Sequence, residues 1–437
     1  MKILAGGNKD ILRTIIAVFL IAPIFFSLES GLFRSSEFMF ESAGIVSKLP
    51  IPLSVLACYL GIALMGNYRR ADIGIAVLFG TFVLMAISTV ATTSIAQSFE
   101  RGKMYLLVQY LLPMFALALG MIYEDHEHNR RRFEKTTLVV LALLVPFQLV
   151  ATWAQGTVFL TPYLYIFSVY QHLQYVPTIF ASVYVLSLFA LWNERGWNWM
   201  LVALAPALGV YATASGSMSA LAVGALGTVA LIVRNLWVER NARAVSLALS
   251  IAILFISFAA AFNTYVSSGT KTETSSLNGS EWGMYSQKMS PAGVANVVQR
   301  LTIWRHYGAM VTKNPTSFFL GQGQPPERTH LTSAHNYYLD FIYNFGFFAS
   351  LPIVVLIGLT LRLVFTERRK VIESSGLFGL VMIVGMLLLA ENSVKVGMRI
   401  PYPGIFTFFL WGLLLSRLDL FRLKRVLEIN VAGKAFA

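Results

Sequence analysis

The chain has 437 residues, of which 56% are hydrophobic and only 13% are charged. Because an ordinary water-soluble chain carries about a quarter charged residues, this composition excludes a protein that hides its apolar side chains in one soluble core. The net charge of +13 would suit nucleic acid or anionic lipid as a partner, but the positions of the basic residues give it another meaning.

Apolar runs of roughly 20 residues, the length that spans the bilayer hydrocarbon, follow one another along the chain. Their approximate bounds are 11–28, 47–65, 71–92, 104–122, 137–154, 173–192, 198–213, 215–233, 244–264, 341–361, 375–391 and 402–416. Inside lipid each backbone polar group must be hydrogen-bonded within the protein, so such runs form helices or barrel strands. Barrel strands alternate polar and apolar residues, and these runs do not. We therefore predict an all-α, polytopic membrane protein with about twelve transmembrane helices.

The basic residues indicate how these spans are oriented. With the N-terminus on the cytoplasmic side, most of the 34 Lys and Arg residues fall in cytoplasmic segments, in accord with the positive-inside rule. The basicity therefore indicates topology rather than a nucleic-acid partner, and both termini are predicted to be cytoplasmic. The first run lacks a clean small-x-small cleavage site, so we interpret it as a retained helix and not as a signal peptide.

The predicted topology divides the chain into three regions. Residues 1–264 hold the first nine spans, residues 265–340 form one large outer loop, and residues 341–437 hold the last three spans and a cytoplasmic tail. A connection as long as this loop is usually functional or disordered. Its first half contains SSGTKTETSSLNGS, whose Ser, Thr and Gly content is typical of a flexible segment.

The second half of the loop is predicted to carry an amphipathic helix. Ser290 followed by Pro291 is a helix-start signal, and apolar residues recur beyond it at helical spacing. Arg300 and Arg305 lie near or off the apolar stripe. Two interpretations stay open: a helix on the bilayer surface with solvated basic side chains, or a helix that roofs a cavity and points an arginine at an anion.

Two short polar stretches stand at the predicted outer edge of the bilayer. In TSAHNYYLDFIYNFGFFASLP, His335 and Asn336 lie where the large loop meets the tenth span. A lone histidine there would serve as a cap for the loose backbone groups of the helix. In ENSVKVGMRIP, Lys395 and Arg399 precede the last span, where a cation is either a snorkelling anchor or a phosphate clamp.

Metal-binding patterns do not occur in the outer segments of the sequence. There is no D-x-D or D-x-E cluster in an outer loop, and Cys58 is the only cysteine. The sequence therefore predicts no metal, no cofactor and no disulfide within the chain.

The stretch that begins at His335 resembles a motif of the bacterial O-antigen ligase and polysaccharide polymerase superfamily. The family pattern is His, then Asn, Ser or Gln, nine residues, Gly, two residues, and Gly, Thr or Tyr. Here His335 and Asn336 are followed by YYLDFIYNF, Gly346, two phenylalanines and Ala349. Twelve predicted spans with one large periplasmic loop before the tenth are similar to the family over the whole chain.

Other segments resemble the family or depart from it. RLTIW, which contains Arg300 and Trp304, and GQG at 321–323 look like the family. Ala349 departs from the last position of the ligase motif. Many members also have an Arg after a Ser at the head of the eighth span, where this chain reads Ser-Gly-Ser at 215–217. Both departures favour a polymerase over a ligase.

The resemblance implies a GT-C-like, metal-independent glycosyltransferase of the bacterial inner membrane. It would move a saccharide from undecaprenyl pyrophosphate to a sugar hydroxyl at the periplasmic face. In a polymerase the acceptor is the next lipid-linked repeat unit of an exopolysaccharide, capsule or O-antigen, and in a ligase it is lipid A core. The expected partners are the lipid-linked saccharide, membrane lipids, and a chain-length regulator and a flippase of the same pathway.

The resemblance also implies roles for individual residues. His335 would take the proton of the acceptor hydroxyl as a general base, and Asn336 would orient it or hold a sugar hydroxyl. Gly346 would permit close helix packing. Cations would stabilise the departing lipid pyrophosphate, and the substrate-binding candidates are Arg300, Arg305, Lys395 and Arg399.

A transporter or export component for polysaccharide is a hypothesis from another class. Transporters usually carry charged or Gly/Pro-broken positions in the middle of their spans. These spans have few midspan charges, and the polar residues gather in an outer loop, which favours chemistry at the membrane surface.

Overall fold

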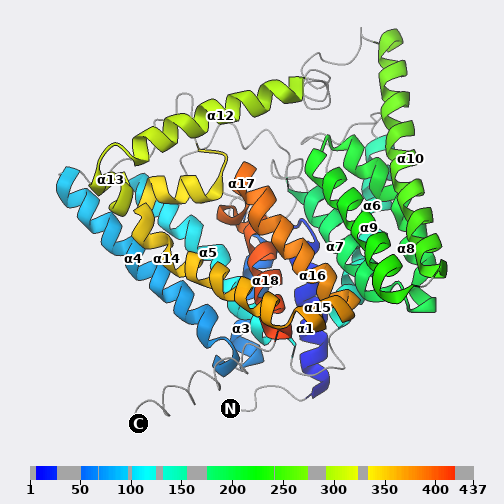
Figure 1. Cartoon of the computed structure of the whole chain (residues 1–437), viewed down its shortest axis with the longest axis horizontal. Helices are drawn as coiled ribbons and strands as arrows, with labels where there is room; N and C mark the ends of the chain where they lie inside the picture. The colour runs from blue at the N-terminus through cyan, green and yellow to red at the C-terminus, as the bar shows by residue number, and fades with distance from the viewer. Residues whose placement is uncertain are drawn as a thin grey trace.

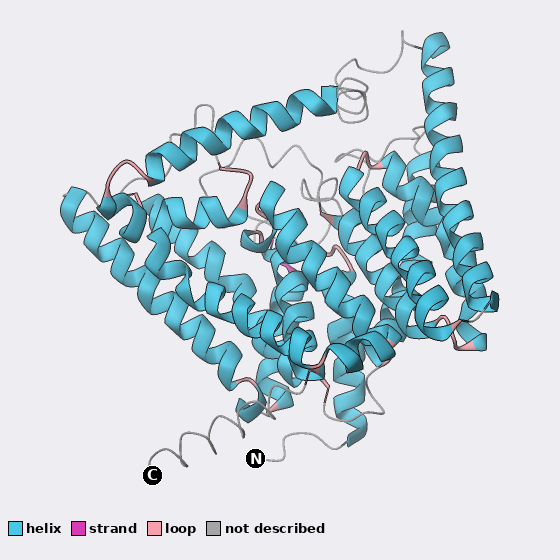
Figure 2. Ribbon diagram, in the orientation of Figure 1, coloured by secondary structure: helices cyan, strands magenta, loops and turns pink. Residues whose placement is uncertain are grey.

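The computed structural model describes residues 6–26, 51–66, 68–96, 101–124, 131–154, 175–240, 242–273, 292–322 and 333–418, and almost all of them are helical (Figure 2). The Ser290-Pro291 helix start and the tail beyond residue 418 lie outside the described residues, as does the 274–280 part of SSGTKTETSSLNGS. Two strands of two residues each, β1 (Phe25–Phe26) and β2 (Ile51–Pro52), pair antiparallel with Phe25 opposite Pro52.

The helices follow the apolar runs in chain order. The α-helices are α1 (Gly6–Ile21), α3 (Leu53–Met65), α4 (Asp72–Ala96), α5 (Arg101–Tyr123), α6 (Arg132–Ala154), α7 (Val176–Leu191), α8 (Arg195–Ala214), α9 (Met218–Arg234), α10 (Ala242–Glu273), α12 (Ala292–Val311), α13 (Pro315–Leu320), α14 (Tyr337–Thr366), α15 (Arg368–Glu373), α16 (Ser375–Gly385), α17 (Asn392–Val394) and α18 (Pro401–Arg417). Two short segments are 3-10 helices: η2 (Tyr68–Arg70) and η7 (Gly397–Arg399). Two others are π-helices: η5 (Asn235–Glu239) and η6 (Met386–Glu391).

Seven segments of the described chain are long and apolar enough to cross a membrane, so the protein is a helical multi-pass membrane protein. They are 72–95, 102–123, 132–154, 218–239, 245–264, 337–366 and 375–394. Every predicted apolar run overlaps a helix, but α1, α3, α7, α8 and α18 do not meet the same criteria of length and composition. The count of twelve spans therefore stays a prediction.

Helix α10 differs from its predicted run. It continues to Glu273, nine residues past the predicted end at residue 264, and takes up the first seven residues of the segment expected to be flexible. Extending an existing helix needs no new nucleus, which explains why Ser, Thr and Gly residues remain helical here.

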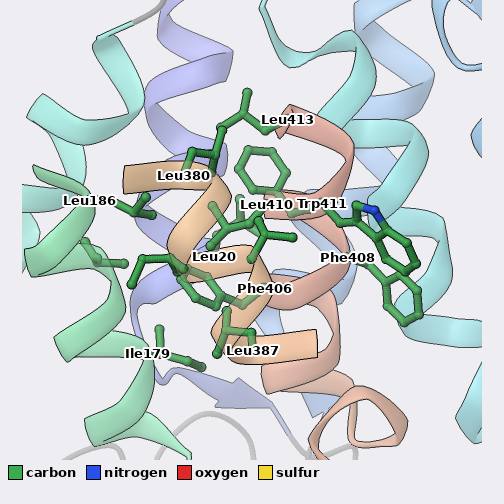
Figure 3. Close-up of a cluster of buried hydrophobic side chains, with 14 of the residues drawn as sticks. Leu20, Ile179, Leu186, Leu380, Leu387, Phe406, Phe408, Leu410, Trp411 and Leu413 are labelled. Carbon is green, nitrogen blue, oxygen red and sulfur yellow. The ribbon is translucent and has the colours of Figure 1, made fainter. Parts of the chain in front are cut away.

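The core lies where α5 and α18 cross. Helix α18 is buried along almost its whole length, and side chains from α1, α7 and α16 close around it (Figure 3). Glycines allow the close approach: a Cβ added to Gly120 would collide with the carbonyl oxygen of Phe409, and one added to Gly412 with that of Leu117. Small residues at such crossings let helix backbones touch, as in other membrane bundles.

The two ends of the bundle differ. The start of α1 and the end of α18 lie at one end, and α12 lies across the opposite end (Figure 1). At the first end, Arg417 reaches Glu124 with Nη2 at 2.6 Å from Oε1 and Glu134 with Nη1 at 2.8 Å from Oε1. All three residues are buried. This cluster joins α5, α6 and α18.

Helix α14 changes direction at Gly346. That residue has φ 77° and ψ 171°, which breaks the helix inside the run that was predicted to be one span at 341–361. Residues 337–345 lie across the end of the bundle under α12, and the rest of α14 descends through it (Figure 1). The break leaves 20 helical residues, Phe347 to Thr366, for the descending part.

Candidate functional site

The segment 333–336 leads into α14 and carries His335. His335 has φ 48°, in the left-handed region that histidine tolerates better than most non-glycine residues. Its backbone N–H donates to Ser333 Oγ at 3.3 Å. His335 is an exposed residue, held by its backbone, although neighbouring groups partly desolvate its imidazole.

The helix cap is formed by Asn336 and not by His335. Asn336 Oδ1 accepts a hydrogen bond from the backbone N–H of Leu339 at 3.1 Å, which is the usual geometry of an N-cap. The backbone N–H of Tyr337 donates to the carbonyl oxygen of Lys395 at 3.0 Å. The first backbone N–H groups of α14 are therefore bound by Asn336 and by the carbonyl oxygen of Lys395, and the His335 side chain does not cap the helix.

A buried carboxylate links His335 to a distant arginine. Asp340 has no exposed surface. Its Oδ1 accepts from the backbone N–H of Ala334 at 3.0 Å. Its Oδ2 accepts from the hydroxyl of Tyr110 at 2.5 Å and from Nη1 of Arg399 at 2.6 Å. We call Asp340, Tyr110, Arg399 and the backbone of Ala334 the Asp340 cluster; it joins α5, α14 and η7.

Helix α12 contributes two further ties to this region. Arg300 Nη1 donates to the carbonyl oxygen of Val394 at 3.0 Å. Trp304 Nε1 donates to the carbonyl oxygen of Ala334 at 3.0 Å, next to His335 in the chain. Arg300 and Trp304 are therefore bound to neighbouring protein segments, and the two interpretations of this helix, a surface helix with solvated basic side chains and a roof that points an arginine at an anion, stay predictions.

The turn after η6 holds Lys395 and Arg399. Asn392, which is buried, ties the turn together: its Nδ2 donates to Leu387 O at 2.7 Å, and its Oδ1 accepts from Met398 N at 2.8 Å. Lys395 Nζ lies 3.3 Å from Glu391 Oε1, and 5.4 Å from the ring centre of Tyr175. A π-helix such as η6 often marks a functional site.

The electrostatics of His335 suit a neutral imidazole. Partial desolvation, and then the positive charges of Arg300 and Arg399, lower the pKa of His335 below its ordinary value, while the negative charge of Asp340 acts in the opposite direction. Because the ordinary value is 6.5, the imidazole is mostly uncharged at pH 7. An uncharged imidazole is the form that accepts a proton.

Not every candidate from the sequence joins this region. Arg300, His335, Lys395 and Arg399 are connected through the 333–336 segment, Asp340 and the 392–399 turn. Arg305 lies on an exposed position of α12, and in the described part of the chain no hydrogen bond or ion pair ties it to them.

Gly346 packs against the end of α13. A Cβ added to Gly346 would collide with the carbonyl oxygen of Phe319 and lie 2.5 Å from Leu320 N. Across the contact, Gly321 has φ 80°, and a Cβ there would lie 2.7 Å from the backbone N of Gly346. The next residue, Gln322, accepts a 2.8 Å hydrogen bond from Lys103 Nζ through its carbonyl oxygen. The two glycines therefore let the end of α13 and the break in α14 touch.

Sequence reasoning missed Asp340, Tyr110 and Asn392. A signal was present for Asp340, because an acidic residue in an otherwise apolar segment usually faces the protein interior and pairs with a partner. Tyr110 and Asn392 carried no comparable signal. Among the described residues, no group of three or more His, Cys, Asp or Glu side chains is arranged to hold a metal ion.

No protein-family model matches the chain, and no curated protein matches it in sequence. The fold itself defines the class, which is a helical multi-pass membrane protein. At one end of its bundle an exposed histidine follows Ala334, whose backbone is joined through Asp340 to Arg399, and desolvation and nearby arginine charge lower the pKa of this histidine. Such an arrangement can accept a proton from one molecule and stabilise negative charge on another.

Proposed function

We propose that this protein is a metal-independent glycosyltransferase that polymerises a bacterial surface polysaccharide. It transfers a saccharide from undecaprenyl pyrophosphate to a hydroxyl of the next lipid-linked unit, at the outer face of the inner membrane. The observation that carries the proposal is the exposed His335 at one end of the bundle, whose preceding residue Ala334 is joined to Arg399 through the carboxylate of Asp340. The resemblance of the His335–Gly346 stretch to the polymerase and ligase superfamily supports it.

The proposed chemistry combines a general base and a group of cations in one step. His335 takes the proton of the acceptor hydroxyl, and the hydroxyl oxygen forms a bond to the anomeric carbon of the donor sugar. The bond from that carbon to the pyrophosphate oxygen breaks, and the electron pair remains on the pyrophosphate. Arg300, Lys395 and Arg399 stabilise this charge, and guanidinium groups are well matched to phosphate oxygens.

The orientation belongs to the same proposal. The end of the bundle that carries α12 and His335 faces the periplasm, and the end with the start of α1 and the end of α18 faces the cytoplasm. The concentration of Lys and Arg in the short segments at that second end supports this orientation.

The test is transfer by purified protein in liposomes that contain lipid-linked repeat units. His335→Asn removes the base but keeps a residue that tolerates positive φ, so the loop keeps its backbone. Loss of a general base typically costs about 10²–10⁴-fold in rate, and we expect single unpolymerised units to remain. His306→Asn, at an exposed position of α12, is the matched control and should polymerise as the wild type does.

The alternatives predict other results. A ligase would transfer the saccharide to lipid A core and would not extend lipid-linked units. A transport component would move the lipid-linked saccharide across the liposome membrane without forming a glycosidic bond. If wild-type protein does not extend lipid-linked units, the proposed function is wrong.

A further inference from the structure

The carboxylate of Asp340 has no part in the proposed chemistry, yet three hydrogen bonds hold it in place near the site. It is fully buried and accepts three hydrogen bonds, at 3.0, 2.5 and 2.6 Å, from Ala334, Tyr110 and Arg399. The three donors belong to segments far apart in the chain. A single side chain therefore sets the relative positions of three segments.

Each donor has a different consequence for the site. The N–H of Ala334 belongs to the residue before His335, so this bond fixes the backbone that carries the imidazole. The guanidinium of Arg399 reaches Asp340 through Nη1, and its buried Nε has no hydrogen-bond partner in the described part of the chain. Tyr110 anchors the carboxylate to α5, and its ring lies 5.0 Å from that of Phe341.

We infer that Asp340 is a positioning residue that couples the His335 segment to Arg399, so that the base and the cation keep a fixed separation. The inference rests on the proposed function, in which both groups act on one substrate. It goes further by assigning the geometry of the site to a residue that touches no substrate.

A purely structural role would explain Asp340 less well. Replacing a buried ion pair by apolar residues of similar volume is often neutral or stabilising, so packing alone does not require a carboxylate among Tyr110, Phe341 and Phe345. The arrangement also places a negative charge where it partly offsets the effect of Arg300 and Arg399 on the pKa of His335.

The test compares Asp340→Asn with a matched buried carboxylate. Glu134 is also buried and is paired with an arginine, at the opposite end of the bundle. Both Asp340→Asn and Glu134→Gln are expected to lower the amount of folded protein. Per folded molecule, Asp340→Asn should transfer about 10²-fold more slowly, the cost of displacing a reacting group by about 1 Å, whereas Glu134→Gln should transfer at the wild-type rate. Asp340→Glu, which keeps the charge, should recover part of the loss.

A second readout needs no substrate. Diethyl pyrocarbonate modifies neutral imidazole, so the pH dependence of His335 modification, followed by mass spectrometry, reports the pKa of His335. Asp340→Asn removes the negative charge that raises this pKa and leaves Arg300 and Arg399 uncompensated, so the profile should move to lower pH. Glu134→Gln should not move it.

The outcomes separate this inference from the proposed function. If wild-type protein transfers no saccharide, the proposed function fails, and the modification profile still decides whether Asp340 is coupled to His335. If Asp340→Asn has the wild-type profile, or if an active wild type and Asp340→Asn transfer equally per folded molecule, Asp340 is not a positioning residue.

Discussion

Gly346→Ala is the sharpest test of how α14 presents the candidate site. The backbone at Gly346, with φ 77° and ψ 171°, lies in a region that is essentially restricted to glycine, and a side chain there costs about 1–3 kcal/mol. The added Cβ would also collide with the backbone of Phe319, and overpacking of this kind costs about 1–3 kcal/mol. Together these terms predict a loss of about 2–6 kcal/mol.

Gly358→Ala is the matched control on the same helix. Its Cβ would meet nothing within 4 Å, and Ala is favoured over Gly in a helix by about 0.5–1 kcal/mol. The measurement is the temperature at which the purified protein in detergent loses its monodisperse peak on size-exclusion chromatography. We expect this midpoint to fall for Gly346→Ala and to stay level or rise for Gly358→Ala. Equal midpoints for Gly346→Ala and wild type would refute the argument that the break requires glycine.

Two further predictions concern the cations and the topology. Arg300→Ala should reduce transfer strongly, because this side chain is hydrogen-bonded to the turn that holds Lys395. Arg305→Ala should have a small effect, because Arg305 is exposed and makes no hydrogen bond or ion pair with that turn in the described part of the chain. Initial rates of transfer in liposomes measure both variants, and equal losses would contradict the proposed site. Reporter fusions after Asn278 and after Arg369 should give periplasmic and cytoplasmic signals respectively, and the opposite signals would overturn the orientation.

The helices could be predicted from the sequence because a segment that spans lipid is a continuous run of apolar residues. Each apolar run overlaps a helix of the structure, since the backbone of such a segment satisfies its polar groups locally. The break at Gly346 was not predicted. It lies against the backbone of Phe319 and Leu320, which belong to another segment, and a glycine in an apolar run looks the same whether its φ is positive or negative.

The candidate site could be predicted only in part, for a similar reason. His335 and Asn336 stand out as polar residues at the edge of an apolar run, but the sequence suggested His335 as the cap, whereas the structure gives the N-cap to Asn336, a residue type that is preferred there. The Asp340 cluster joins residues 110, 340 and 399. These hydrogen bonds depend on how α5, α14 and η7 pack together. They join residues far apart in the chain, so no local sequence pattern predicts them.

The crossing of α5 and α18 has a consequence for the order in which the protein is made. About 280 residues separate the end of α5 from the start of α18, so at a synthesis rate of about 5–20 residues per second α5 waits roughly a quarter of a minute to a minute for its main partner. During this time the backbone near Gly120, which later touches Phe409, has only lipid, the insertion machinery or other helices beside it. A nascent chain on a ribosome stalled before residue 400 would thus already contain His335 and Asp340. Arg399 would not yet be paired with Asp340, and the helix that closes the core would be missing.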